Sequence, residues 1–408
     1  MKKLFIAFFL FIPVTLIFAE GYQVNLQGNR QTGMAHVGTA LNFGSSSIHF
    51  NPGTLSKLQT DFDFQVGMSA IIGHNTFQKA FPSTYEASTD NPVGTPFYFY
   101  GAGKINEKLV VGLGITTPYG NTIKWGDNWN GRYLIQDISF KAICFQPTVS
   151  YSITDNIGLG AGFILATGDV DLHKAIPVSD GTTEGQAELT GKTVSYGYNL
   201  GLYFTPTAKL SLGIDYRSEI DMKMEDGDAL FTVPASLQSN FPSPNKFDAE
   251  LPLPANLSFG VGYSINEKLL LATDLQMVFW SAYEALSFDF KDNTSSLTDQ
   301  VNPKNFENTL IFRIGAEYSL NDIIQARIGF AYDPTPVPED YISPETPGAN
   351  KLNFHLGLSA HLSEKLSLDA SFQFIKAMER EDGYAPADFY GIYNTNAFIP
   401  GIGLNYSF

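Results

Sequence analysis

Short segments that alternate apolar and polar residues recur along almost the whole chain. In the clearest one, residues 352–362, an apolar side chain occupies every second position, and the residues between are polar or glycine. A period of two is typical of a β-strand with one apolar and one polar face. Fourteen such segments lie between about residue 60 and the C-terminal Phe408, so the pattern predicts an all-β protein.

The connections between the predicted strands are alternately very short and long. The six tight turns are 105–108, 153–156, 205–209, 265–268, 320–323 and 362–365. The seven long loops are about 74–95, 119–138, 170–192, 223–254, 290–307, 334–350 and 379–397. An even number of strands, with short turns on one side and long loops on the other, predicts a 14-stranded antiparallel transmembrane β-barrel of the bacterial outer membrane.

The last predicted strand supports this interpretation. Ile402, Leu404, Tyr406 and Phe408 share one face, and a terminal Phe on an alternating strand is the usual end of such a barrel. The first and last strands must pair, because lipid does not tolerate an open sheet edge. A soluble β-sandwich would show the same alternation, but it would not explain the asymmetry of the turns.

The N-terminal region has a different pattern. Residues 1–19 combine Lys2 and Lys3 with the apolar stretch 4–18, which predicts a signal peptide; an uncleaved anchor is the alternative. Residues 20–58 lack the alternation and carry few charges, which is unlike a disordered periplasmic tail. Because the lumen of fourteen strands is wider than its own side chains fill, we expect 20–58 to be a plug, or hatch, inside a barrel of residues 59–408.

Composition excludes several other classes of protein. The formal net charge of −16 argues against nucleic acid as a partner. A single cysteine, Cys144, excludes an internal disulfide, and the strand phase predicts that it faces the lumen. The six histidines show no metal-ligand spacing, and no motif nominates a catalytic triad or a cofactor site. We therefore expect no enzyme activity, no metal and no cofactor.

Several motifs resemble the FadL family, outer-membrane transporters of long-chain fatty acids and related hydrophobic compounds. They are Gly21-Tyr22-Gln23-Val24-Asn25, Asn51-Pro52-Gly53, residues 112–120, Trp129-Asn130-Gly131-Arg132-Tyr133, residues 146–151 and residues 158–162. The family has Asn-Pro-Ala where this chain has Gly53. The resemblance implies a 14-stranded barrel plugged by an N-terminal hatch, with Gly21, Tyr22, Asn51, Pro52 and Gly53 at the hatch and its gate.

The resemblance also implies a route for the ligand. Extracellular loops capture it, a pocket near the hatch receives it, and an inward kink of the third strand releases it sideways into the membrane. In this chain the third strand contains Gly112 and Gly114 and ends at Pro118. Glycine in a strand often marks a kink or a close backbone approach. A strand that merely packs near the hatch is the alternative.

The fourth long loop, 223–254, is unusually apolar. It contains Phe231, Val233, Leu237 and Phe241, and exposed apolar clusters of this kind mark binding surfaces. We expect these side chains to capture the ligand. A loop core folded over the barrel mouth is the alternative, and the two interpretations are compatible.

The strand phase directs several charged residues into the lumen, among them Asp215 and Glu317 and the basic residues Arg217, Arg313 and Arg327. Buried charges need partners, so a salt-bridge network that braces the hatch is the simplest interpretation. Arginine also binds carboxylates in a bidentate fork, and one of the three is a candidate for contact with an acidic ligand.

The sequence therefore predicts passive transport of fatty acids or similar hydrophobic molecules across the outer membrane. The alternatives are a general diffusion porin and a surface adhesin or receptor barrel. The ligand class stays open between fatty acids and aromatic hydrocarbons. We expect a monomer whose other partners are outer-membrane lipid, lipopolysaccharide and, during biogenesis, the barrel-assembly machinery.

Overall fold

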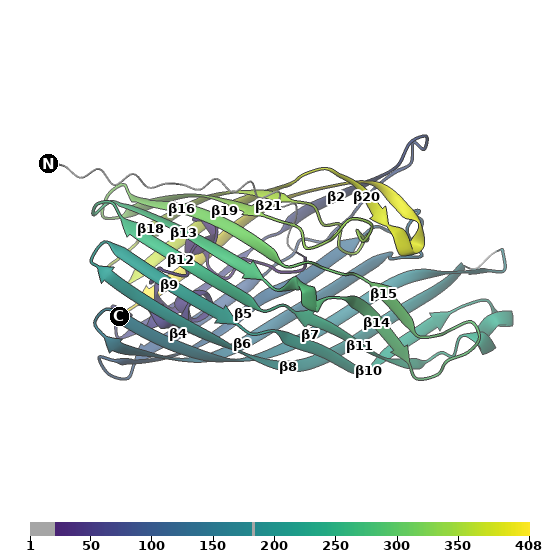
Figure 1. Ribbon diagram of the computed structural model, residues 1–408, viewed down its shortest axis with the longest axis horizontal. Coiled ribbons are helices and arrows are strands. Elements are labelled where there is room, and N and C mark those ends of the chain that lie inside the picture. The colour runs from purple at the N-terminus through teal and green to yellow at the C-terminus, as the bar shows by residue number, and fades with distance from the viewer. Residues whose placement is uncertain (1–20, 182–183) are drawn as a thin grey trace.

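The computed structural model describes residues 21–181 and 184–408, so the predicted signal peptide lies outside the described residues. Fourteen antiparallel strands form a closed barrel, which confirms the predicted fold class (Figure 1). The first strand segment, Phe62–Ser69 (β1), pairs on one side with Phe97–Lys104 (β4) and on the other with Phe389–Ser407 (β21). The wall therefore has no open edge between its first and last strands.

Local breaks divide some of the fourteen wall strands, so the sheet contains 21 segments. The undivided strands are β5 (Leu109–Lys124), β6 (Asp137–Thr154), β7 (Ile157–Ser179), β8 (Glu184–Thr207), β17 (Ile324–Asp333), β18 (Lys351–His361) and β21. The divided ones are β1 with β2 (Ile72–Lys79), β3 (Glu86–Ser88) with β4, β9 (Leu210–Arg217) with β10 (Ile220–Thr232), β11 (Asn245–Leu253) with β12 (Asn256–Ser264), β13 (Leu269–Val278) with β14 (Ala285–Phe290), β15 (Gln300–Pro303) with β16 (Thr309–Ser319), and β19 (Leu366–Ala377) with β20 (Arg380–Tyr384).

The strands are longer than the sequence pattern indicated. β7 and β8 continue to Ser179 and from Glu184, so most of the predicted loop 170–192 is a paired hairpin. β10 and β11 likewise occupy most of 223–254, where a short turn, η2 (Ala235–Asn240), joins them. In these extensions the outward positions change from apolar to charged residues. The apolar alternation therefore stops where the charged residues begin, although the backbone pairing continues. For this reason the sequence pattern predicted loops where the structure has paired strands.

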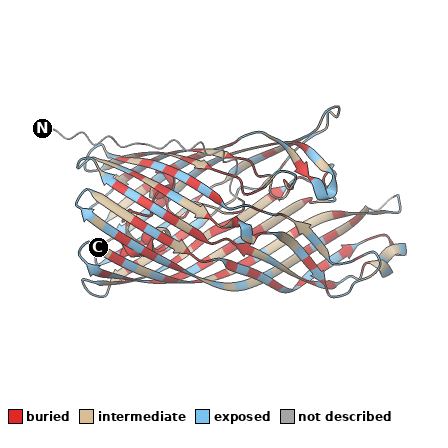
Figure 2. Ribbon diagram, in the orientation of Figure 1, coloured by how far each residue is buried: buried red, intermediate tan, exposed pale blue. Residues whose placement is uncertain are grey.

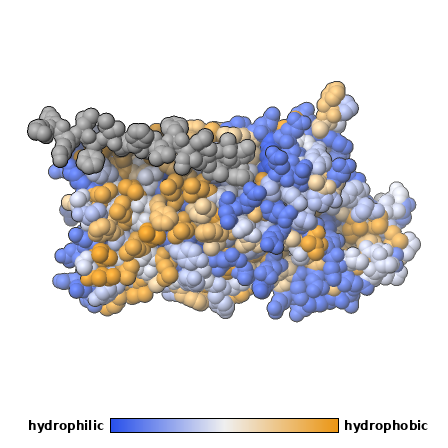
Figure 3. Space-filling model, viewed as in Figure 1, coloured by the Kyte–Doolittle hydropathy of each residue, from blue (hydrophilic) through white to orange (hydrophobic). Residues whose placement is uncertain are grey.

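The outward face of the barrel is apolar around the end with the short turns. Buried and exposed residues alternate along each strand (Figure 2). Apolar residues gather over the half of the visible wall that holds β9, β12, β13 and β16, and hydrophilic residues cover much of the other half (Figure 3). The exposed apolar side chains in that half include Ile214, Phe259, Val261, Leu271, Leu275, Phe312 and Ile314. This band suits contact with lipid.

Residues 21–58, here called the N-terminal segment, lie inside the barrel. The segment contains four short helical turns: α1 (Asn29–Thr32), η1 (Gly44–Ser46), α2 (Ser47–Phe50) and α3 (Pro52–Leu55). Lumenal glycines let it approach the wall closely. A Cβ added at Gly213 would lie only 1.9 Å from the carbonyl oxygen of Thr39. Among the described residues, no helix is long and apolar enough to cross a membrane.

Candidate functional site

The barrel wall has a gap between its second and third strands. β4 pairs with β5 only as far as Tyr98 opposite Thr116, and the register of β5 shifts between Thr116 and Tyr119. Beyond that point, Asp90 N donates to Lys124 O over 2.9 Å. Within the described part of the chain, residues 118–123 therefore form no ladder with the second strand. Pro118 contributes to the gap because it has no N–H to donate.

The N-terminal segment pairs with this part of β5 instead. Val24 N donates to Pro118 O over 2.8 Å, and Gly120 N donates to Tyr22 O over 3.0 Å. An isolated β-bridge joins Gln23 to Tyr119 between these bonds. Residues 22–24, here called the gate strand, thus satisfy backbone groups of β5 from inside the barrel.

A cavity lies at the gap and is lined by residues from both faces of the wall. Its inner lining includes Val24 and Tyr119, and its outer lining includes Phe97 and Ile143. The Phe97 side chain is exposed on the outward face of β4. This cavity, here called the wall cavity, therefore lies in the barrel wall beside the gate strand.

A second, mainly apolar cavity lies in the lumen, and we call it the lumenal pocket. Side chains from β6, β7, β8, β10, β11 and β14 line it, among them Phe140, Leu172, Leu189, Met222, Met224 and Phe247. Phe140 and Asn121 line both this pocket and the wall cavity. Tyr22 also lines the pocket, and its ring lies 5.9 Å from that of Phe140. The gate strand therefore stands where the two cavities adjoin.

Hydrogen bonds and aromatic contacts hold the gate strand in place. The hydroxyl group of Tyr22 donates to the carbonyl oxygen of Pro252, and its ring lies 4.9 Å from that of Trp280. A Cβ added at Gly21 would lie 2.8 Å from the Trp280 ring, which explains a glycine at this position. Tyr119 Oη donates to Pro254 O over 3.1 Å, so both tyrosines bind the eighth barrel strand.

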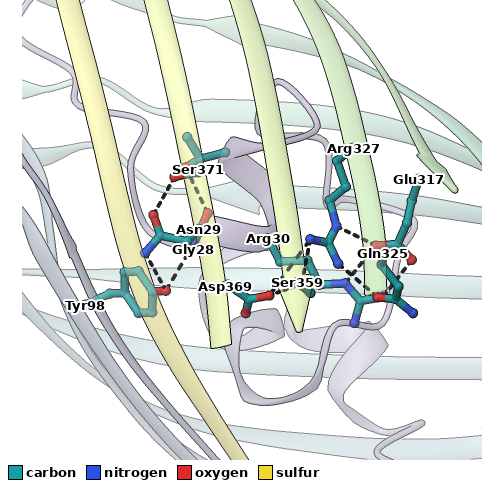
Figure 4. A network of polar contacts seen from close by, with 11 residues as sticks. Gly28, Asn29, Arg30, Tyr98, Glu317, Gln325, Arg327, Ser359, Asp369 and Ser371 are labelled. Atoms are coloured by element: carbon teal, nitrogen blue, oxygen red, sulfur yellow. Dashed lines mark hydrogen bonds and ion pairs between the residues drawn. The ribbon is translucent and has the colours of Figure 1, made fainter. Parts of the chain in front are cut away.

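A buried network of charges binds α1 to the wall (Figure 4). Arg30 and Arg327 share the carboxylate of Glu317, at N–O distances of 2.7 and 2.6 Å. Arg327 also donates to Ser359 Oγ over 2.6 Å and lies 3.9 Å from Asp369. The network thus links α1 to β16, β17, β18 and β19.

Neighbouring polar contacts extend this attachment of α1. Asn29 N and Nδ2 each lie 3.1 Å from the hydroxyl oxygen of Tyr98, and Ser371 Oγ donates to Asn29 Oδ1 over 2.6 Å. Beyond α1, Asp274 of β13, the strand that pairs with β16, accepts hydrogen bonds from the backbone N–H groups of Gly38 and Thr39.

The three predicted arginines all lie buried against the lumen. Arg327 is engaged in the network above. Arg217 donates to Gln146 Oε1 and to His49 O, both over 3.1 Å, and so contacts the N-terminal segment. Arg313 lines a small lumenal cavity beside residues 23–26. These positions suit a bracing role, and contact with a ligand carboxylate stays a prediction.

Asn51, Pro52 and Gly53 begin α3 at the wall. Asn51 Oδ1 accepts from Gly53 N over 2.8 Å, and Pro52 O accepts from Ser150 Oγ over 2.5 Å. An alanine Cβ at Gly53 would lie 2.8 Å from the carbonyl oxygen of Gly201, so glycine fits the close approach here.

Gly112 and Gly114 lie below the gap, where β5 is still paired with β4. Added Cβ atoms would lie 2.7 and 2.9 Å from Ile48, so both glycines permit close packing of the N-terminal segment. Of the three residues proposed for a lateral opening, only Pro118 lies within the gap itself.

The apolar residues of the predicted capture loop form a cluster at the mouth. Phe231, Val233 and Phe241 are buried and Leu237 is partly buried. The ring of Phe231 lies 6.1 Å from Phe241 and 5.7 Å from Phe290. The structure therefore shows a packed loop core, and a role in capture stays a prediction.

Sequence reasoning missed a group of polar residues at the mouth. Lys304 is buried, pairs with Glu345 and donates to Ser343 Oγ over 3.0 Å. A small pocket contains Ser343 and Glu345 together with Lys174, and it shares Leu172 and Phe288 with the lumenal pocket. No spacing along the chain brings these residues together. For the charge network at α1 the sequence did offer a signal, because Arg30 is the one arginine in residues 20–58.

The fold and the site define a class of protein: an outer-membrane transport barrel with its own N-terminal segment inside the lumen. The chain belongs to the family described as outer membrane protein transport protein (OMPP1/FadL/TodX), whose model matches residues 12–408. This family places the protein in the bacterial outer membrane, and its members are transport channels and not enzymes.

Similar proteins span the same length. A long-chain fatty acid transport protein of Escherichia coli is 23% identical over 100% of this chain and 99% of its own. A putative outer membrane protein of Neisseria meningitidis is 23% identical over 88% of this chain and 86% of its own.

Two solved structures share the fold. A Pseudomonas aeruginosa FadL homologue superposes with a TM-score of 0.83 at 18% identity, covering 95% of this chain and 100% of its own. The Ralstonia pickettii toluene transporter TbuX superposes with a TM-score of 0.72 at 19% identity, covering 93% and 98%.

Proposed function

We propose that the protein carries hydrophobic molecules passively from the cell surface into the outer membrane through the lumenal pocket and the wall cavity. The observation that carries the proposal is the adjacency of these cavities: Phe140 and Asn121 line both, and the gate strand stands between them. An apolar molecule that follows this route never enters bulk water. It thereby avoids a free-energy cost that is proportional to its exposed apolar area.

The gate strand supplies the step that releases the ligand. Two backbone hydrogen bonds and the hydroxyl group of Tyr22 hold it in place. A net contribution of about 1 kcal/mol for each such bond is small enough for a bound ligand to offset. Ligand in the lumenal pocket would displace Tyr22 and open the passage past Phe140.

The ligand class follows from the surfaces and from the relatives. The lumenal pocket is lined mainly by apolar side chains. Its lining also includes Glu345, which pairs with the buried Lys304. Relatives named as long-chain fatty acid transport proteins and as a toluene transporter support long-chain fatty acids or hydrophobic aromatic compounds as ligands. The capture surface would be the apolar cluster around Phe231 and Phe241.

A substitution that fills the lumenal pocket tests this proposal. Ala249→Trp directs a large ring into the pocket, whereas Lys246→Trp adds the same ring to the outward face of β11. Cells that lack transporters of their own should take up radiolabelled fatty acid or toluene with the unchanged chain and with Lys246→Trp, but about tenfold more slowly with Ala249→Trp. Unchanged uptake by a correctly assembled Ala249→Trp barrel would contradict the proposal.

A general diffusion porin is the alternative with the clearest physical test. The N-terminal segment fills the lumen with buried side chains such as Met34, Val37, Ile48 and Leu55. In planar bilayers we expect the intact chain to show no large, stable conductance. A large steady conductance would favour the porin.

A further inference from the structure

The wall has a second break, between the eighth and ninth barrel strands. The ladder between β11 and β14 covers only Phe247–Ala249 and Phe288–Phe290. The next backbone bond between these two barrel strands runs from Phe279 N to Ala255 O over 2.9 Å. Among the described residues, 250–254 and 280–287 therefore face each other without a ladder, and we call this stretch the second gap.

The local sequence explains why pairing stops there. Pro252 and Pro254 have no N–H groups, so neither can donate to a neighbouring strand. On the other edge, the short helical turn η3 (Trp280–Ala282) replaces extended backbone. The carbonyl groups of Pro252 and Pro254 accept instead from Tyr22 and Tyr119 inside the barrel.

The lumenal pocket reaches both edges of the second gap. Ala249 and Leu251 line the pocket from one edge, and Tyr283, Leu286 and Phe288 line it from the other. Leu251 and Leu286 are both only partly buried. At this place side chains close the pocket, and they can rotate aside far more readily than a hydrogen-bonded ladder can separate.

The outer rim of the second gap is acidic. Glu250 is exposed on one edge and Glu284 on the other, and Glu219 and Asp221 are exposed beside Glu250 on the seventh barrel strand. Lys223 pairs with Glu250 over 3.7 Å, which leaves the rim with four carboxylates and one ammonium group. Such a rim repels anions and has no such effect on uncharged molecules.

We propose that the second gap is a lateral entrance through which uncharged hydrophobic molecules pass between Leu251 and Leu286 into the lumenal pocket. Acidic ligands use the mouth, where Lys174 lines the small pocket and Lys304 pairs with Glu345 of the same pocket. This inference rests on the proposed transport function and adds a second point of access, chosen by the charge of the ligand.

Bridging the gap tests the inference. Leu251→Cys and Leu286→Cys, in a Cys144→Ala background, are joined with a short bis-methanethiosulfonate reagent, which a reductant later cleaves. The control pair is Asp228→Cys and Lys246→Cys, which are directly opposite each other across the intact ladder of β10 and β11 and lie outside the lumenal pocket. Both pairs join neighbouring barrel strands, but only the first spans the second gap and reaches the lumenal pocket.

The readout is the rate at which full-length protein in liposomes binds two fluorescent probes. N-phenyl-1-naphthylamine is uncharged, and cis-parinaric acid carries a carboxylate. Bridging the gap should slow loading of the uncharged probe by about tenfold, with recovery on reduction, while the acid loads at nearly its original rate. The control bridge should slow neither probe.

Three results would overturn the inference: an unchanged rate for the uncharged probe, equal slowing of both probes, or equal slowing by the control bridge. These results would leave the proposed transport function intact. If the unbridged protein bound neither probe, the proposed function itself would fail, together with this inference.

Discussion

Replacement of one buried carboxylate should loosen the N-terminal segment inside an intact barrel. Glu317 accepts hydrogen bonds from both Arg30 and Arg327, and its side chain is only 9% exposed. Glu317→Gln keeps the shape of the side chain but removes the charge that the two arginines share. Asp369, at 3.9 Å from Arg327, and Asp63, which also attracts Arg30, then remain as anions near the two arginines.

The structure sets the size of the effect. Removal of one partner from a buried ion pair costs about 3–5 kcal/mol. Because the Arg30 side chain is 29% exposed and Asp369 remains, we take the lower end of this range. About 3 kcal/mol corresponds to roughly a hundredfold rise in the equilibrium constant for opening of α1.

Hydrogen exchange at the amides of α1 and its C-terminal cap measures this opening. Thr32 N donates to Gly28 O over 2.8 Å, and Gly33 N donates to Asn29 O over 3.1 Å. In Glu317→Gln these amides should exchange about a hundredfold faster, while the amides of the barrel ladders keep their rates. Equal exchange in the variant and the unchanged chain would refute the reasoning.

A second variant separates the network from a general loss of packing. Arg30→Met leaves the pair of Glu317 and Arg327 in place, so we expect a smaller effect. When both changes are combined, the loosening should be less than the sum of the two, because both act through one network. Simple additivity would show that the residues do not act as a unit.

Two further changes test the mouth of the barrel. Alanine at Phe231, Leu237 and Phe241 together should slow uptake of hydrophobic ligands several-fold, because it removes apolar surface from the capture cluster; uptake at the original rate would contradict the capture role. Burial raises the pKa of the Glu345 carboxyl, but Lys304, the backbone N–H of Glu345 itself and Ser343 together lower it further, so the pKa lies below the ordinary 4.5. The stability from this pair is therefore present above pH 4.5 and is lost as the pH falls through the folded pKa. In the unchanged chain, opening of the nearby loop, measured by hydrogen exchange of its amides, should increase as the pH is lowered. In Lys304→Met the loop should already be open more often at neutral pH. If opening of the loop in the unchanged chain did not depend on pH, the pair would not stabilise it.

The alternating pattern was sufficient to predict the number of wall strands and the side of the wall that their residues face. It placed Cys144 and the charges of Arg217, Arg313 and Arg327 on the lumenal face, and all four side chains are buried there. The reason is physical: once a strand is paired, a period of two leaves no freedom about which side a residue faces.

The contacts of the N-terminal segment were beyond such reasoning. Arg30 and Glu317 are 287 positions apart in the chain. Their meeting depends on how the segment is rotated inside the closed barrel, and strand periodicity does not encode that rotation. The same holds for Lys304 and Glu345, which loops bring together at the mouth.

The breaks in the wall were only partly readable. Prolines mark both of them, since each removes a backbone donor. The sequence could not show whether the chain would kink, bulge or pair elsewhere at Pro118. In the structure the gate strand pairs with β5 there, and that outcome needs a partner from a distant part of the chain.

Closure of the first gap tests the central claim most directly. Thr95 and Thr122 line the wall cavity from the second and third barrel strands. Cysteines at both positions, in a Cys144→Ala background, are joined by a thiol crosslinker. In the control, Thr122→Cys is instead joined to Ser139→Cys, its neighbour across the intact ladder of β5 and β6.

The measurement is the initial rate of uptake of a radiolabelled long-chain fatty acid by cells that lack transporters of their own, before and after cleavage of the bridge. If hydrophobic molecules leave through this gap, the bridge from Thr95 to Thr122 abolishes uptake, cleavage restores it, and the control bridge has no effect. Undiminished uptake through the bridged barrel would contradict the account.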